Sequence, residues 1–219
     1  MYARALSAVF ALAFVVGSGI SAVSTDAATQ SATARIVVRP VTEAGTPAPG
    51  VLVTPDQKSG SVACHPADPS PGAVNRDIEF CSPSAAYAVA CWKAATPRHV
   101  LCSRDPSSGE VFSLPRSGTF ASTGLAARHN RAPLRLVIGN GSVCSIRDGG
   151  AWSSLHAHPN WYGTYSCTGN GAVWSPQNAP HSGINESQRV WMVHVAPISG
   201  NGPVTVRTVR KAYFVGTHS

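Results

Sequence analysis

Short apolar stretches rich in Val, Ile, Leu and Trp alternate along the chain with pieces rich in Gly, Pro, Ser and Thr. Beyond residue 28, no stretch keeps its apolar residues at helical spacing, and the scattered prolines would interrupt a helix. Short β-branched and aromatic stretches bounded by turn residues are typical of strands. The pattern therefore predicts an all-β fold in which antiparallel hairpins, stapled by disulfides, form a sandwich or a partly closed barrel.

The C-terminal half carries the strongest hairpin signals. A Gly-Asn-Gly triplet occurs three times between strand-like stretches, at residues 139–141, 169–171 and 200–202. Asn-Gly favours a two-residue type I′ turn, in which both central residues have positive φ. Such a turn in the first triplet places Cys144 opposite Val137. The same turn in the second triplet places Cys167 opposite Trp174.

The N-terminal half gives weaker signals. Residues 87–92 and 99–102 are typical of two strands around a turn, which would bring Cys91 near Cys102. Residues 105–133 are rich in Ser, Gly and Pro and predict long surface loops. We expect residues 29–60 to be a loosely ordered segment, because only residues 35–38 look like a strand before a linker-like piece. A single β-rich, disulfide-bonded domain is then expected over residues 61–219.

Residues 1–28 have the features of a signal peptide. Arg4 lies just before an apolar run from Leu6 to Val16, and small residues follow, with cleavage expected after Ser24 or Ala27. The apolar run is shorter than the roughly 20 residues that a membrane-spanning helix needs. An uncleaved anchor is the alternative. The sequence predicts a secreted protein of the extracellular space or cell envelope, with no transmembrane segment in the mature chain.

All six cysteines lie beyond the signal peptide, and an exported protein meets an oxidising compartment in which thiols pair. Sequence alone leaves the connectivity open. Closure of short loops favours the pairs Cys64–Cys81, Cys91–Cys102 and Cys144–Cys167. A metal or redox role is the alternative for these thiols. No C-x-x-C motif and no cofactor motif occurs, so we expect structural disulfides and no cofactor.

The chain carries a net charge of +7, which favours anionic partners without choosing among them. We therefore expect an anionic envelope surface, or another secreted or host protein, as partner. Nucleic acid is not expected, because the protein is exported and has no recognition motif. Arg207, Arg210 and Lys211 form a basic cluster, with Arg207 and Lys211 on one strand face and Arg210 on the other. The cluster is a candidate contact for an anionic partner, or alternatively the protection of an edge strand.

Two histidines are the most metal-like feature of the sequence. His156 and His158 are two residues apart, so they would share one face of an extended segment, and imidazole is a common metal ligand. His181, His65 or Asp148 could complete such a site only through folding. Surface histidines in a polar loop are the default interpretation of this pair, so we expect no metal site in the protein, and a metal site is the alternative.

Signals for other chemistry are weak. No G-x-S-x-G motif follows the signal peptide, and Asp77 with Glu79 is the only close acidic pair, which we expect on a solvated strand face. These absences favour a protein that is not an enzyme, and they assign no catalytic residue. Aromatic residues crowd the C-terminal half and either fill the core or line a ligand groove. They are Trp152, Trp161, Tyr162, Tyr165, Trp174 and Trp191.

Residues 144–152 (CSIRDGGAW), followed by residues 162–167 (YGTYSC), resemble a pattern in uncharacterised secreted, cysteine-containing proteins of actinobacteria. Cys91-Trp92 and residues 101–106 (LCSRDP) fit the same resemblance, which covers residues 80–216. It implies an exported bacterial β-rich protein with disulfides and transfers no catalytic residue. Our leading hypothesis is a non-catalytic binding or interaction protein. The alternative is a secreted hydrolase or metal-dependent enzyme that uses the region of His156 and His158.

Overall fold

The computed structural model describes residues 31–55, 60–83, 88–120, 122–147 and 154–219. The predicted signal peptide at residues 1–28 lies outside them. The described residues form strands and two short 3-10 turns without an α-helix, which confirms the predicted all-β class. In this part of the chain, no helix has the length and apolar character needed to cross a membrane.

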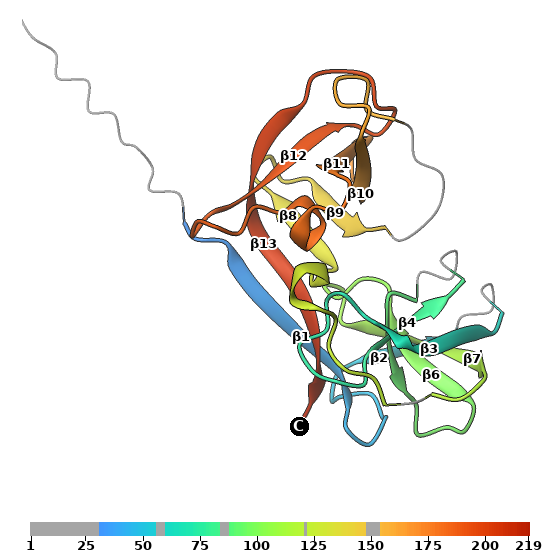
Figure 1. The fold of residues 1–219 in the computed structure, drawn as a ribbon. Helices are drawn as coiled ribbons and strands as arrows, with labels where there is room; N and C mark the ends of the chain where they lie inside the picture. The colour runs from blue at the N-terminus through green and yellow to red at the C-terminus, as the bar shows by residue number, and fades with distance from the viewer. Residues whose placement is uncertain (1–30, 56–59, 84–87, 121, 148–153) are drawn as a thin grey trace, which may run out of the picture.

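The C-terminal half forms a closed barrel, the upper one in Figure 1. Each strand pairs antiparallel with the next one along the chain, and the last also pairs with the first, which closes the ring. The strands are β8 (Arg135–Ile138), β9 (Val143–Ile146), β10 (Trp161–Cys167), β11 (Gly171–Pro176), β12 (Trp191–Pro197) and β13 (Thr205–His218). Large apolar side chains fill the interior, among them Leu136, Tyr165 and Trp191.

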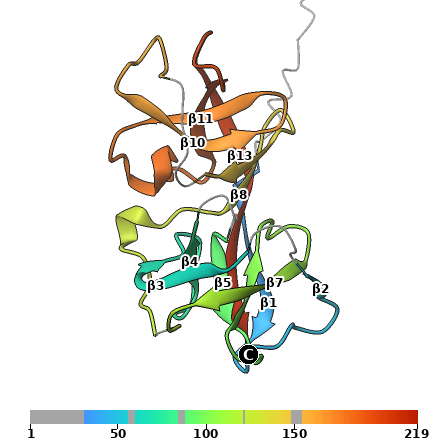
Figure 2. The ribbon, with the colours of Figure 1, turned by 90° about the vertical axis from the view of Figure 1, so that its right-hand side faces the viewer.

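The N-terminal half forms a second, smaller closed sheet, which lies below the first barrel in Figure 2. Its strands are β2 (Leu52–Pro55), β3 (Val62–Pro69), β4 (Glu79–Ser82), β5 (Ala90–Lys93), β6 (His99–Ser103) and β7 (Glu110–Ser117). Strands β3 to β7 follow one another antiparallel, and a parallel pairing of β7 with β3 closes the ring. Strand β2 adds to β7 in parallel.

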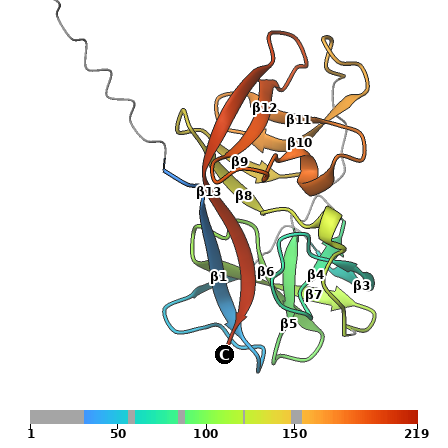
Figure 3. The same cartoon turned by 60° about the vertical axis from the view of Figure 1, so that its left-hand side comes forward.

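Strand β13 joins the two barrels. Its first part pairs with β12 and β8, and its second part pairs in parallel with β1 (Ala34–Thr42), as Figure 3 shows. Val41 of β1 and Val215 of β13 pack into a core cluster with Ile78 and Trp92 of the N-terminal barrel. The prediction that residues 29–60 are loosely ordered is therefore wrong for their described part, because β1 and β2 pair with strands far away in the sequence.

Three disulfides staple the barrels, in the pairing that short loop closure favours: Cys64–Cys81, Cys91–Cys102 and Cys144–Cys167. No cysteine is free. Each disulfide joins residues that lie directly opposite each other on neighbouring antiparallel strands. Two of the disulfides lie in the core of the N-terminal barrel and the third lies in the core of the C-terminal barrel.

The predicted hairpin register is wrong by one residue in β8–β9. Cys144 lies opposite Leu136, because the loop has three residues, 139–141, and Ile138 bonds to Ser142 across it. The second hairpin also turns through three residues, so Cys167 lies opposite Gly171, and the prediction that it lies opposite Trp174 is wrong. There Gly169 and Asn170 are the consecutive residues with positive φ. A three-residue loop is the next commonest hairpin connection after the two-residue turn.

One strand lies where long loops are predicted. Residues 105–133 contain β7, whose Val111, Phe112 and Leu114 are buried in the N-terminal barrel. The rest of this segment ends in the 3-10 turn η2 (Arg128–Asn130), which faces the turn η3 (Pro180–Gly183) of the C-terminal barrel. These turns lie between the two barrels in Figure 1.

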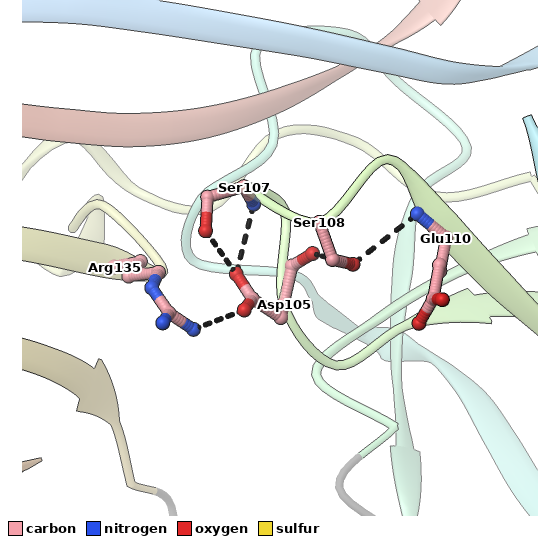
Figure 4. A network of polar contacts seen from close by, with 5 residues as sticks. All are labelled: Asp105, Ser107, Ser108, Glu110 and Arg135. Atoms are coloured by element: carbon pink, nitrogen blue, oxygen red, sulfur yellow. Dashed lines mark hydrogen bonds and ion pairs between the residues drawn. The ribbon is translucent and has the colours of Figure 1, made fainter.

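A polar network also ties the barrels together. Asp105, from the loop after β6, forms an ion pair of 2.5 Å with Arg135 on β8 (Figure 4). The other carboxylate oxygen of Asp105 accepts hydrogen bonds from the backbone N–H and the hydroxyl of Ser107, at 2.8 and 2.6 Å. The hydrogen bonds from Ser107 therefore orient the Asp105 carboxylate toward Arg135. The ion pair helps to hold the two barrels in one arrangement.

Candidate functional site

A cluster of cationic side chains surrounds a cavity where β1, η2 and the loop before β12 meet. We call this cavity the arginine pocket; its volume is about 840 Å³. Its ionisable lining residues are Arg35, Arg128, Arg131, His181, Glu186 and His194. The indole of Trp161 and the ring of Phe214 form apolar parts of its wall. A concave site with an apolar wall and a few converging polar groups is typical of a ligand site.

The turn η3 shapes the pocket and has an unusual backbone. His181 and Ser182 both adopt the left-handed conformation, with φ of 53° and 54°, and Gly183 follows with φ of 82°. Two consecutive non-glycine residues in this region cost conformational energy, so the surroundings must hold them. Thr164 on β10 donates its hydroxyl to the Ser182 carbonyl at 2.9 Å. The sheet thus fixes the turn that carries His181.

His181 links this turn to η2. Its Nδ1 lies 2.9 Å from the backbone carbonyl of Arg131. A carbonyl only accepts hydrogen bonds, so Nδ1 carries the proton and donates, and a neutral imidazole keeps Nε2 as an acceptor. This bond connects the C-terminal barrel to the segment that carries both Arg128 and Arg131. Arg128 and Arg131 are therefore tied to the turn that carries His181.

We expect Gly183→Ala to lower the free energy of unfolding by about 2–4 kcal/mol. A Cβ at Gly183 would lie 2.1 Å from Cβ of the buried Ser175, and the left-handed φ adds strain. The matched control is Gly169→Ala, which has a φ of 75° but no atom within 4 Å of the added Cβ. Denaturant unfolding of both variants separates the steric clash from the backbone strain. Equal losses in the two variants would contradict this account of the turn.

The three arginines are held in different ways. Arg35 lies over the rings of Phe214 and Trp191, at 4.7 and 5.6 Å from the ring centres. Arg131 donates its Nε to the carbonyl of Ala126 at 2.9 Å, which fixes the guanidinium plane and leaves its terminal nitrogens for other acceptors. Among the described residues, the guanidinium of Arg128 has no hydrogen-bond or ion-pair partner. The guanidinium of Arg128 and the terminal nitrogens of Arg131 are therefore hydrogen-bond donors that can pair with an anionic ligand.

Among the described residues that line the arginine pocket, Glu186 is the only carboxylate. Partial burial raises the pKa of Glu186, and the positive charges of His181 and Arg35 oppose this rise. Even when Glu186 is ionised, its single negative charge neutralises only one of the three arginine charges. The described lining therefore keeps an excess of positive charge.

Trp161 supplies a fixed aromatic wall. His158 stacks on its indole, with ring centres 4.4 Å apart and an angle of 18° between the planes. His194 meets the same indole edge-on at 4.9 Å. Two neighbouring rings thus restrict the rotation of Trp161, so a ligand in the pocket meets a preformed apolar surface.

Among the residues that the structure describes, no further metal ligand joins His156 and His158, the pair that the sequence offers as a candidate metal site. His156 is exposed, whereas His158 stacks on Trp161. Among the suggested third ligands, His181 turns to η2, and the His65 side chain and Asp148 lie outside the described residues. Within the described residues, the only close group of potential metal ligands is Cys64, Glu79 and Cys81.

Arg207, Arg210 and Lys211 are all exposed on β13. Their interpretation as edge-strand protection is wrong, because β13 lies inside the sheet, between β12, β8 and β1. Lys211 and Phe214 are an odd number of residues apart in a regular strand, so they point to opposite faces. Lys211 therefore faces away from the arginine pocket, and the structure does not bring it together with the pocket arginines.

The aromatic residues divide between core and pocket. Tyr165, Trp174 and Trp191 are buried. Trp161 lines the arginine pocket, and Tyr162, with 39% of its surface exposed, lines a second cavity. Trp152 lies outside the described residues. Three members of the group therefore fill the core, whereas Trp161 and Tyr162 line cavities.

The prediction that Asp77 and Glu79 both lie on a solvated strand face is wrong for Glu79. We expected a solvated strand face for Asp77 and Glu79, and Asp77 is indeed exposed, but Glu79 has no exposed surface. Burial, together with the charge of Asp77 and the weaker effect of Asp68, raises the pKa of Glu79 to about 7, although Arg116 acts in the opposite direction. A signal was present in the sequence: Glu79 lies two residues before Cys81 and so shares its strand face.

The pocket residues Arg35, Arg128, Arg131, Glu186 and His194 were not predicted from the sequence. They come from separate segments, and no spacing pattern links them. Comparison with known proteins adds no further information: no family model, curated protein or solved structure matches the chain. The resemblance of residues 80–216 to secreted proteins of actinobacteria stays a prediction, and function must be argued from the geometry.

Proposed function

We propose that this protein is an exported, non-catalytic binding protein whose arginine pocket takes an anionic ligand. The observation that carries this proposal is the convergence of Arg35, Arg128 and Arg131 on one cavity that contains a single carboxylate among its described residues. Guanidinium groups pair with carboxylates and phosphates through two parallel hydrogen bonds. The cavity volume of about 840 Å³ suits a small ligand or one unit of a polymer.

Export and charge support the same proposal. The predicted signal peptide would direct the chain out of the cytosol, and the three disulfides are compatible with an extracellular protein. A net charge of +7 would attract the protein to an anionic surface before the pocket engages. We propose the cell envelope or extracellular space as its location, with an anionic envelope polymer or an acidic secreted or host protein as its partner.

The alternative, a hydrolase or metal-dependent enzyme, gains no specific support from the region of His156 and His158. His158 stacks on Trp161, and no described third ligand approaches the pair. The geometry therefore favours binding over catalysis at this site. The aromatic wall fits a binding role, because it gives the apolar part of a ligand a surface beside the cationic groups.

We expect the double variant Arg128→Ser/Arg131→Ser to bind inorganic polyphosphate at least tenfold more weakly than the wild-type protein. A hydrogen bond to a charged group contributes about 1.5–3 kcal/mol, so loss of two such donors exceeds this threshold. The measurement is isothermal titration of the oxidised mature protein with polyphosphate at fixed ionic strength.

The matched control is Arg207→Ser/Arg210→Ser, which removes the same charge from exposed positions on β13. We expect this variant to keep most of the wild-type affinity. Equal weakening in the two variants would show that overall charge, not the pocket, binds the anion. Wild-type protein that does not bind polyphosphate would remove the phosphate version of the proposal.

A further inference from the structure

The core of the N-terminal barrel contains a buried carboxylate beside a disulfide. Glu79 and Cys81 are two residues apart on β4, so their side chains point to the same face. Cys64 on β3 lies directly opposite Cys81. One carboxylate oxygen of Glu79 and the two sulfur atoms all lie within 4.8 Å of one another. Two adjacent strands thus bring three potential metal ligands into one compact group.

Glu79 has no partner that explains its burial. Neither carboxylate oxygen accepts a hydrogen bond within the described part of the chain, and the side chain has no exposed surface. An unpartnered carboxylate in a core is destabilising, because burial removes its hydration without replacing it. A cation bound to the carboxylate would compensate for this loss. The disulfide sulfurs next to it are poor ligands until they become thiolates.

We propose that Cys64, Cys81 and Glu79 form a zinc site that opens when a dithiol reductant reduces the Cys64–Cys81 disulfide. The dithiol is oxidised to its own disulfide and delivers two electrons and two protons, which convert the bridge into two thiols. Each thiol then releases its proton to solvent as its sulfur binds Zn²⁺. Two thiolates and one carboxylate, with a water molecule in the fourth position, are a ligand set of the kind that zinc accepts.

The Cys144–Cys167 disulfide is a control for this site within the same molecule. The disulfide Cys144–Cys167 also joins opposite residues of neighbouring strands, but it lies in the other barrel. In the described residues, no third metal ligand approaches its sulfurs. Reduction of this pair would give two thiols without a carboxylate. The proposed site therefore depends on Glu79, and not on cysteine pairs in general.

The test measures zinc binding by the full mature chain. The protein is reduced with dithiothreitol, freed of reductant by gel filtration without oxygen, and titrated with ZnCl₂. We expect one zinc ion per chain in the reduced wild-type protein and in Cys144→Ser/Cys167→Ser, and none in the oxidised protein. Glu79→Gln should bind zinc at least tenfold more weakly, and Cys64→Ser/Cys81→Ser should lose this site. Cobalt substitution adds a spectroscopic readout, because thiolate ligation gives a sulfur-to-cobalt charge-transfer band.

Two results would overturn the proposal. One is the absence of zinc from the reduced wild-type protein. The other is equal affinity in wild type and Glu79→Gln, which would mean that free thiols bind the metal without the carboxylate. Circular dichroism of each reduced sample shows whether it stays folded. In a sample that reduction has unfolded, equal zinc binding by Cys64→Ser/Cys81→Ser and by Cys144→Ser/Cys167→Ser would also overturn the proposal, because the metal would then bind any cysteine pair.

Discussion

Reduction of all three disulfides in the absence of metal is expected to unfold the protein. Each bridge closes a short loop, with sequence separations of 17, 11 and 23 residues. The chain-entropy model assigns about 3 kcal/mol to each loop of this size. Their joint loss is comparable with the roughly 5–15 kcal/mol that stabilises a typical domain. The measurement is a thermal melt followed by circular dichroism, with and without reductant and chelator.

Single-bridge variants refine this prediction. Cys144→Ser/Cys167→Ser removes the staple of the C-terminal barrel, whereas Cys91→Ser/Cys102→Ser removes one from the N-terminal barrel. We expect each to lower the free energy of unfolding by about 3 kcal/mol and to increase hydrogen exchange first in its own barrel. A melt that reductant leaves unchanged, in a sample with six titratable thiols, would contradict the structural role of the disulfides.

Glu79→Gln is expected to abolish a pH-dependent loss of stability in the oxidised protein. The pKa of Glu79 rises from the model-compound value of 4.5 to about 7, first because of burial and then because of the charge of Asp77. Between these two values the folded state binds more protons than the unfolded state, so stability falls as pH rises. The favourable contribution is complete below about pH 4.5 and is lost as pH passes through about 7.

The size of this effect follows from the pKa difference. Each unit corresponds to 1.36 kcal/mol, so wild-type protein should lose about 3 kcal/mol between about pH 5 and pH 8 through this side chain. The measurement is the free energy of unfolding in urea across this range, with disulfides intact. Glu110→Gln is the matched control, because Glu110 is exposed. A wild-type profile parallel to that of Glu79→Gln would show that Glu79 ionises normally.

Local features of this fold could be predicted from the sequence. The strands around Cys102, Cys144 and Val193 follow from short apolar stretches between turn residues. The three disulfide pairs are those that the closure of short loops favours, although the sequence alone leaves their connectivity open. These features depend on residues that are close together along the chain, where spacing and turn chemistry carry the signal.

Features that depend on distant residues could not be predicted. A Gly-Asn-Gly triplet permits both two- and three-residue turns, so the triplet alone left the register of Cys144 open. Nothing local shows that β13 pairs with β8 and β1, which closes one barrel and binds the other. The arginine pocket depends on the same distant pairings, because they place Arg35 beside Phe214 and bring η2 to η3.

We propose that the arginine pocket, and not the general positive charge, binds this protein to an anionic ligand of the envelope. The most direct test is co-sedimentation of the oxidised mature protein with native envelope fractions at low and high salt. We predict that wild type and Arg207→Ser/Arg210→Ser sediment with the envelope at low salt, and that Arg128→Ser/Arg131→Ser stays in solution. Equal binding by all three proteins, or binding by none, would contradict the claim.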